Sequence, residues 1–310
     1  MSGPAQRLFA LIGRHAASAM VVGVLAGLAI PPLAEALFPL VGPLILIILS
    51  GSLLRLDWGV LGAYRRDPRL PSASVAWLLL AYPLLGWLAA ALLPLPSGLA
   101  TSLVLNAATP PLMGAPAMAL ILGLDAELTA VTVVVVTLAF PATLMALLAA
   151  GAIAVSVEFG AVAARIGLMI GVPVAIGLFG QIVIGRETLA RHKTGFDAVM
   201  VTALVLIAVA LMHGANVALA ADPAAALMIG GVALLFNLVG QMLSAAVFWR
   251  AGLGRAMAMA IMGGNRNLGL TLGITAGFLG PDFAAYVAFA QLPIYFTPVV
   301  LKQVLRRLRR

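Results

Sequence analysis

Gly263-Gly264-Asn265-Arg266-Asn267 interrupts an apolar segment that runs from about residue 256 to residue 278. Arg266 falls near the centre of this segment, whose length is close to the ~20 residues that a helix needs to cross a bilayer. A guanidinium at that depth costs about 2.5–3.5 kcal/mol to insert, and glycine weakens a helix. Irregular backbone and charge persist at membrane depth where they line a cavity and have a function. We therefore expect a broken membrane helix with a functional site at the break.

A second apolar segment, residues 98–122, is broken by Thr109-Pro110-Pro111 and by Gly114-Ala115-Pro116. Proline lacks an N–H and disrupts the helical turn before it, so carbonyls between Asn106 and Met113 are expected to lose their helical partners. Pro110 and Arg266 are 156 residues apart (266 − 110), which is about half of the 310-residue chain. Broken helices at corresponding positions in two halves of a chain indicate the binding site of a secondary transporter.

The composition is typical of a protein embedded in a membrane. Hydrophobic residues make up 63% of the sequence, charged residues 9%, and the mean hydropathy is +1.15, whereas soluble domains carry about 25% charged residues. The absence of cysteine excludes disulfides and thiolate metal sites, and the histidines are not spaced as metal ligands. The net charge of +8 is attributed to basic cytoplasmic loops, not to nucleic-acid binding. No cofactor and no enzymatic activity are predicted, because the spans contain neither paired carboxylates nor a Ser-His-Asp arrangement.

About ten spans of roughly 20 residues are predicted. With the N-terminus inside, nearly all lysines and arginines fall on the inner side, while the outer turns carry acidic residues. This bias predicts a multi-pass inner (plasma) membrane protein with both termini in the cytoplasm, where basic loops and the Arg306–Arg310 tail contact anionic lipid. The predicted spans are residues 16–34, 39–55, 72–93, 98–122, 126–149, 160–182, 197–218, 223–248, 256–278 and 283–304.

The number of spans in each half predicts how the halves are related. Five is an odd number, so the second half enters the membrane with the opposite orientation to the first. The chain is therefore predicted to be an all-α polytopic membrane protein of two inverted five-helix repeats, residues 1–155 and 156–310, with broken helices four and nine crossing near the midplane. Such a duplication supports alternating access, because the two halves can exchange their conformations.

The two breaks together predict a site for a small organic anion. The half-helix after Gly114 presents free N–H groups and a positive dipole end, and the pair Gly263-Gly264 is expected to do the same for span nine. Arg266 adds a permanent charge and N–H donors suited to a carboxylate or sulfonate. The candidate substrate-binding residues are Asn106, Thr109, Pro110, Gly114, Gly263, Gly264, Asn265, Arg266, Asn267 and Gln291.

Two stretches of the sequence resemble the bile acid:sodium symporter family and its wider superfamily of ten-helix carriers. One is the proline- and glycine-rich break, followed by the Gly123-Leu124-Asp125 turn into Leu128-Thr129-Ala130-Val131-Thr132. The other is Gly264-Asn265-Arg266-Asn267-Leu268-Gly269-Leu270, which is similar to the family's Gly-x-Gln-Asn-x-x-Leu motif. The resemblance, which by topology spans nearly the whole chain, implies a core domain of spans 3–5 and 8–10, a panel domain of spans 1, 2, 6 and 7, and a substrate bound between them.

The sequence also departs from the pattern of the sodium-coupled members. Met262 stands where those members have an acidic residue, Arg266 where they have glutamine, and Ala115-Pro116 where they have a Ser/Thr-Asn pair. Thr129 and Thr132 remain of the hydroxyl ligands, and Gln241 in span eight is a further candidate ion ligand. Because a carboxylate is lost and an arginine gained, we expect a divergent, bacterial-type member in which Arg266 takes the place of a sodium ion.

Purely structural roles stay open as alternatives for several of these residues. Arg266 could satisfy the carbonyls of the broken helices, since one guanidinium has several donors. Gly263 and Gly264 could allow close helix packing, and Tyr82 is interpreted as a packing or interfacial residue. The alternative functions are sodium-coupled symport through other ligands and a non-transporting sensor on the same fold. A channel is disfavoured because the polar residues cluster at one depth. The oligomeric state is left open.

Overall fold

The computed structural model describes the chain except for residues 1–15, 60–61, 63–67, 154–157 and 309–310. Every regular element named in the described part is a helix, which confirms the predicted all-α class. The predicted boundary between the repeats, at residues 155 and 156, lies outside the described residues, and the inverted relation of the two halves stays a prediction. Outside them too are the inner basic residues Arg7, Arg14, Arg65, Arg66, Arg309 and Arg310.

Seven stretches of described helix are long and apolar enough to cross a membrane, and two shorter apolar helices, Ser18–Ala29 and Ser97–Ala108, accompany them. The protein is therefore a multi-pass membrane protein. The seven stretches are Pro31–Leu54, Arg69–Leu92, Ala126–Ala149, Phe159–Ile184, Lys193–Ala221, Pro223–Val247 and Pro281–Gln303. The remaining predicted spans are the first, which is short, and the fourth and ninth, which are each divided into two half-helices.

Most of the predicted spans correspond to more than one helical element. In the first half the elements are α2 (Ala16–Ala29), α3 (Pro31–Leu37), η1 (Phe38–Leu40), α4 (Val41–Leu54), α6 (Arg69–Ala76), η2 (Trp77–Ala81), α7 (Tyr82–Leu92), α8 (Ser97–Ala108), α9 (Ala115–Ile121) and α10 (Ala126–Ala149). In the second half they are α11 (Phe159–Ile166), η3 (Gly167–Gly171), α12 (Val172–Ile184), α13 (Arg186–Arg191), α14 (Lys193–Ala221), α15 (Pro223–Val247), η4 (Trp249–Ala251), α16 (Leu253–Gly264), α17 (Leu268–Thr275) and α18 (Pro281–Leu308).

The predicted boundary between spans one and two is wrong. The first span was expected to continue to residue 34, but α2 ends at Ala29 and a new helix begins at Pro31. Pro31 and Pro32 lack N–H groups and therefore suit the first turn of a helix rather than its interior. The second membrane stretch consequently starts at Pro31 instead of residue 39 and is one of the seven long apolar stretches.

Both predicted breaks are present, and local chemistry explains their limits. α8 ends at Ala108 and α9 begins at Ala115, because Pro110 and Pro111 supply no N–H to continue the helix. In span nine the helix stops after Gly264. It resumes at Leu268 because the side chain of Asn267 accepts the N–H of Leu270 at 3.4 Å and so caps α17.

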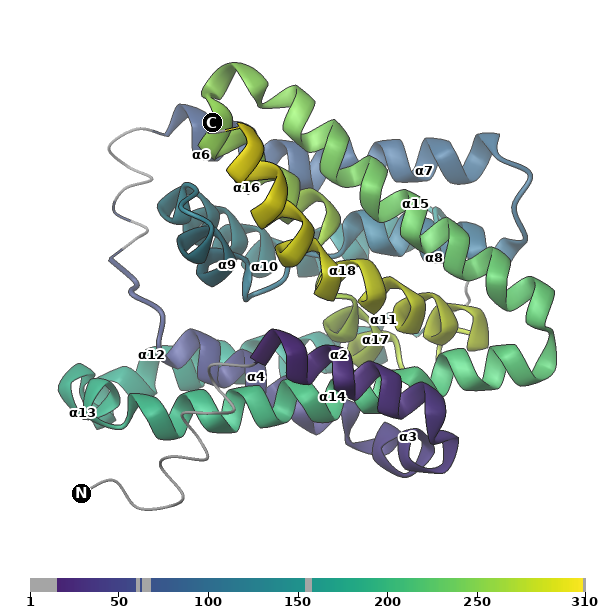
Figure 1. Cartoon of the computed structure of the whole chain (residues 1–310), viewed down its shortest axis with the longest axis horizontal. Helices are drawn as coiled ribbons and strands as arrows, with labels where there is room; N and C mark the ends of the chain where they lie inside the picture. Colours follow the sequence, from purple (N-terminus) through teal and green to yellow (C-terminus); the bar gives the residue numbers. More distant parts are fainter. Residues whose placement is uncertain (1–15, 60–61, 63–67, 154–157, 309–310) are drawn as a thin grey trace.

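The helices form two groups that lie against each other (Figure 1). α2, α3, α4, α12 and α14 form the lower group in that view, and α7, α8, α15, α16 and α18 belong to the upper one. α14 contacts α18 across the boundary between the groups, and α17 contacts both α4 and α18. The half-helix α17 therefore lies where the two groups meet.

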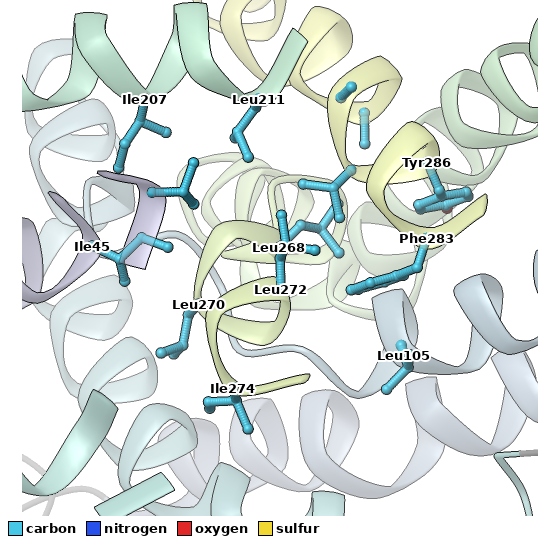
Figure 2. Packing of buried hydrophobic residues seen from close by; sticks show 14 of the residues in the cluster. Ile45, Leu105, Ile207, Leu211, Leu268, Leu270, Leu272, Ile274, Phe283 and Tyr286 are labelled. Carbon is cyan, nitrogen blue, oxygen red and sulfur yellow. The ribbon is translucent and has the colours of Figure 1, made fainter. Parts of the chain in front are cut away.

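Apolar side chains surround α17 on several sides (Figure 2). Leu268, Leu270, Leu272 and Ile274 of α17 are buried together with Ile45 of α4, Ile207 and Leu211 of α14, and Phe283 of α18. Within a bilayer this burial stabilises mainly through van der Waals packing, because lipid tails are as apolar as the side chains. On the side facing α4, a Cβ added to Gly269 or Gly273 would meet Ile45 Cδ1 at 3.5 or 3.6 Å, so α17 lies close to α4.

Charged contacts also join the elements, although most lie near the surface. Arg165 on α11 donates a hydrogen bond to the carbonyl of Ala276, just after α17, and its Cζ lies 4.6 Å from the ring centroid of Phe278. This contact links an element of span six to the end of span nine. The ion pairs recorded in the described part of the chain are Arg55–Asp197, Arg186–Asp57 and Arg255–Asp125. Such exposed pairs contribute about 0–1 kcal/mol each.

Candidate functional site at the crossing of two broken helices

The two breaks are joined to each other by backbone hydrogen bonds. Leu112 N donates to Asn265 O at 2.9 Å, and Asn267 N donates to Pro110 O at 2.8 Å. These bonds form an isolated antiparallel bridge between Pro111 and Arg266. The bridge satisfies backbone groups that the broken helices leave without partners, which a membrane interior requires. Pro110 and Asn267 are therefore hydrogen-bonded to each other although they lie 157 residues apart in the sequence (267 − 110).

Arg266 lies at the centre of this crossing and is 1% exposed. Its Nε donates to Gly263 O at 3.2 Å, and its Nη1 donates to Thr109 O at 3.1 Å, so one guanidinium satisfies a carbonyl from each break. Its Cζ lies 4.4 Å from the ring centroid of Tyr82. None of the ion pairs in the described residues includes Arg266. The structural role considered above for Arg266 is therefore real, but it leaves the charge without a carboxylate partner.

Other polar side chains tie the first break to its neighbours. The hydroxyl of Thr109 lies 2.7 Å from Leu105 O and 2.7 Å from the hydroxyl of Thr271 on α17. Asn106 Nδ2 donates to the hydroxyl of Tyr286 on α18 at 2.6 Å. These bonds connect the end of α8 to spans nine and ten, so both predicted residues, Asn106 and Thr109, are bound within the helical bundle around the crossing.

Gly263 and Gly264 do not begin the second half-helix, which corrects the prediction made for them. They are the last two residues of α16 and are buried against α15. A Cβ on Gly263 would lie 2.6 Å from the backbone oxygen of Gly240, and one on Gly264 would lie 2.9 Å from that of Asn237. Both distances are too short for any other residue, so the glycines permit close packing of α15 and α16.

A short hydrogen-bonded chain holds the carbonyl of Gly264. Asn237 Nδ2 donates to Gly264 O at 2.7 Å, and Gln241 Nε2 donates to Asn237 Oδ1 at 2.6 Å and to the hydroxyl of Thr297 at 3.0 Å. The predicted ion ligand Gln241 therefore has protein partners and links α15 to α18. Its amide orients Asn237, which in turn donates to the Gly264 carbonyl at the break.

Several buried polar atoms near the breaks have no hydrogen-bond partner in the described structure. Asn265 is fully buried, and neither its Oδ1 nor its Nδ2 is bonded. Arg266 Nη2 and Asn106 Oδ1 are unpartnered as well, and so are two atoms outside the breaks, Thr132 Oγ1 on α10 and Trp58 Nε1. Burying a polar group without a partner costs about 1–3 kcal/mol. Four of the six unpartnered atoms recorded in the described residues belong to Asn106, Asn265 and Arg266, which lie in the two broken spans. Buried polar atoms without a partner are rare in folded proteins and require an explanation.

The other predicted site residues have no recorded bond to the crossing. Gln291 Nε2 donates to Val287 O of its own helix at 3.1 Å, and the hydroxyl of Thr129 donates to Asp125 O at 2.7 Å. Gly114 is exposed and precedes α9. No group of three or more His, Cys, Asp or Glu side chains that could hold a metal ion occurs among the described residues.

Tyr82 and Thr271 are the neighbours of the crossing that the sequence did not reveal as such. Tyr82 is 4% exposed and faces Arg266, although it was interpreted as a packing or interfacial residue. Its contact with Arg266 depends on how span three packs against span nine, and no local sequence pattern indicates that packing. Thr271 carried a usable signal, because it is a polar residue one helical turn after Asn267 in an apolar span.

The comparisons with known proteins agree with this architecture. The family model described as Sodium Bile acid symporter family matches residues 42–228, which is more than half of the chain. The matched region runs from α4 into α15 and includes the first break, while the break that carries Arg266 follows it. A search of curated proteins found no match. With its apolar helices, its two broken spans and this match, the chain belongs to the sodium bile acid symporter family.

Proposed function

We propose that the protein is a secondary transporter that moves a small organic anion across the inner (plasma) membrane by alternating access, without sodium. Membership of a symporter family supports secondary transport. The anion would bind next to the crossing of the two broken helices, and Arg266 would be its principal ligand. Both termini would face the cytoplasm, as the distribution of basic residues predicts.

The observation that carries this proposal is the buried, unpaired charge of Arg266. Its guanidinium is 1% exposed, has no carboxylate partner among the described residues, and retains an unpartnered Nη2. A buried charge normally has a partner, because removing an ion from water costs several kcal/mol. A carboxylate or sulfonate would supply that partner and accept hydrogen bonds from the free donors. The unpaired amide of Asn265 offers further hydrogen bonds beside it.

Sodium independence follows from the charge at the same place. Met262, in the position where sodium-coupled members have an acidic residue, is fully buried in α16. A cation beside Arg266 would face a like charge at short range in a medium of low dielectric constant, where Coulomb repulsion is strong. Arg266 would therefore act as a fixed cation in the site and make a mobile one unnecessary.

Alternating access would arise from relative movement of the two groups of helices. The lower group in Figure 1 would correspond to the panel domain, and the upper group to the core domain that contains both breaks. The bond from Arg165 to the Ala276 carbonyl, with Phe278 beside it, links span six to the end of span nine on the predicted outer side. The structure would then represent a state that is closed on that side.

One observation favours sodium-coupled symport as the second candidate. Oxygen atoms are the preferred ligands of hard cations, and three buried side-chain oxygens have no partner in the described structure: Asn106 Oδ1, Thr132 Oγ1 and Asn265 Oδ1. A sodium ion bound through such oxygens at a distance from Arg266 would satisfy them. The experiment must therefore separate the dependence on Arg266 from the dependence on sodium.

Thermal unfolding of the purified protein tests the two candidates together. Wild type, Arg266→Gln and Arg266→Lys would be measured against carboxylates and sulfonates, in potassium buffer and in sodium buffer. A bound anion stabilises the folded state by an amount that rises with its occupancy, about 2.7 kcal/mol at 100 times the dissociation constant. We expect stabilisation of the wild type in potassium buffer, a large reduction of it in Arg266→Gln, and a smaller reduction in Arg266→Lys.

Three results would overturn the proposal. Stabilisation that requires sodium and survives Arg266→Gln would assign the arginine a structural role and favour sodium coupling. Uptake of the stabilising anion into proteoliposomes should also proceed with potassium buffer on both sides. Binding without any uptake would identify a sensor rather than a carrier, and sodium-dependent uptake at saturating anion would refute sodium independence.

A further inference from the structure

Tyr82 is the first residue of α7, and its ring faces the guanidinium of Arg266. The Cζ atom of Arg266 lies 4.4 Å from the ring centroid, and both side chains are buried, at 4% and 1% exposure. The electron-rich face of an aromatic ring attracts a cation, and more strongly when both groups are removed from water. Among the described residues Arg266 forms no ion pair, so the face of Tyr82 is the electrostatic partner that the structure shows for this charge.

The surroundings of Tyr82 hold its ring in one orientation. The π-helical turn η2 ends just before it, and such turns occur frequently at functional sites. α15 approaches the ring closely because it has a glycine there, since a Cβ at Gly240 would lie 2.1 Å from the hydroxyl of Tyr82. The rings of Trp77 and Phe236 lie at centroid distances of 6.2 and 5.8 Å. Trp77 is itself fixed, because its Nε1 donates to Ser244 Oγ at 3.0 Å.

An aromatic ring stabilises a buried arginine without neutralising it. A carboxylate in the same place would cancel the charge and occupy the N–H donors in a bidentate pair, and would then compete with an incoming anion. A ring offers its face to the cation and leaves the donors in the guanidinium plane uncommitted. In Arg266, Nε and Nη1 bond to the carbonyls of Gly263 and Thr109, while Nη2 has no partner in the described structure.

We propose that Tyr82 is the positioning residue of the anion site: its ring holds the Arg266 guanidinium in place in the unoccupied carrier and keeps the full charge and the Nη2 donors available to the substrate. The inference rests on the proposed function, because it assumes that the anion binds at Arg266. It predicts that Tyr82 affects anion affinity only through Arg266. It also predicts that the ring is required and that the hydroxyl is secondary.

A double-mutant cycle on the full-length purified protein tests this coupling. The variants are Tyr82→Leu, Tyr82→Phe, Arg266→Gln and the combination of Tyr82→Leu with Arg266→Gln. Benzoate, benzenesulfonate and cholate serve as probes, and their dissociation constants are obtained from the shift of the unfolding midpoint with probe concentration. Phe140→Leu is the matched control, since it removes another buried ring, on α10, that is fully buried and has no recorded contact with Arg266.

The expected pattern is specific to a positioning role. Tyr82→Leu should weaken probe binding about tenfold or more when Arg266 is present and should have no further effect in Arg266→Gln. Tyr82→Phe should bind the probes within about threefold of the wild type, because it retains the ring. Phe140→Leu should lower the unfolding midpoint and leave the dissociation constants unchanged. If Tyr82→Leu does not fold, Tyr82→Met replaces it with an unbranched side chain of comparable length.

The possible failures are distinguishable. If Arg266→Gln weakens probe binding but Tyr82→Leu leaves the dissociation constants unchanged, the positioning role is refuted and the anion site at Arg266 stands. An equal loss of affinity from Tyr82→Leu in both backgrounds would also refute it, because the ring would then act independently of the arginine. If none of the three anions stabilises the wild type, or if Arg266→Gln binds them normally, the proposed function and the positioning role fail together.

Discussion

Replacing Asn265 with leucine should make the protein more stable and functionally inactive. Asn265 is fully buried, and both polar atoms of its side chain lack a partner in the described structure. Its backbone bonds, to Leu112 N and Ile261 O, do not depend on the side chain. Leucine keeps the branched shape of asparagine and removes the amide. The unpaired amide costs about 1–3 kcal/mol, so Asn265→Leu should raise the free energy of unfolding by a similar amount.

Asn237→Leu provides the matched control, because Asn237 is a buried asparagine beside the second break whose two polar side-chain atoms are both bonded. Its Nδ2 donates to Gly264 O at 2.7 Å, and its loss would leave that buried carbonyl unpaired. Asn237→Leu should therefore lower the free energy of unfolding by about 1–3 kcal/mol. The opposite signs of the two changes separate an unpaired amide from a paired one.

Denaturant titration of the detergent-solubilised protein, followed by circular dichroism, measures both changes. The midpoint of unfolding should shift without a change in the slope of free energy against denaturant. Asn265→Leu should also lose the stabilisation by organic anions that the wild type shows. If Asn265→Leu destabilises the protein as much as Asn237→Leu does, the amide has a partner in the folded protein and the reasoning is refuted.

Three further outcomes are expected. Gly263→Ala should lose about 1–3 kcal/mol of stability relative to Gly254→Ala in denaturant titrations. A Cβ at Gly263 would lie 2.6 Å from a backbone oxygen of α15, whereas a Cβ at Gly254, in the same helix, would have nothing within 4 Å. Equal stabilities of the two variants would contradict this prediction. Arg165→Gln should increase amide hydrogen exchange at the end of α17, because it removes a bond to that segment; unchanged exchange would mean that the link is dispensable. The chain contains no cysteine, so Asp222→Cys should react with a membrane-impermeant maleimide in intact cells and Arg250→Cys only after permeabilisation; the reverse would invert the orientation.

The positions of both breaks were predictable because they depend on local chemistry. Pro110 and Pro111 cannot continue a helix in any fold. Arg266 in the middle of an apolar span requires an environment that satisfies it. The two breaks occupy corresponding positions in the two halves of the chain, which predicted that they would lie together. The bridge between Pro111 and Arg266 shows that they do. Composition alone was sufficient for the membrane class.

Other features of the site depend on contacts between distant segments, which local sequence does not encode. The pair Gly263-Gly264 weakens a helix in isolation, yet both residues end α16 because α15 packs closely against them. In the sequence Tyr82 is indistinguishable from an interfacial tyrosine, and only the packing of span three brings its ring against Arg266. The partner of Gln241 on α18 was equally hidden, since the bond to Thr297 joins two different helices. Tertiary packing decided each of these outcomes.

The bridge between the two breaks also constrains how the family can evolve. In an antiparallel pair, a shift of one residue turns every side chain to the opposite face. A one-residue insertion between α8 and α9, or between α16 and α17, would therefore change the register in which Leu112 meets Asn265 and would turn the guanidinium of residue 266 away from the ring of Tyr82. Relatives that keep an arginine here should preserve the lengths of both loops, residues 109–114 and 265–267, even where the identities of the loop residues have diverged.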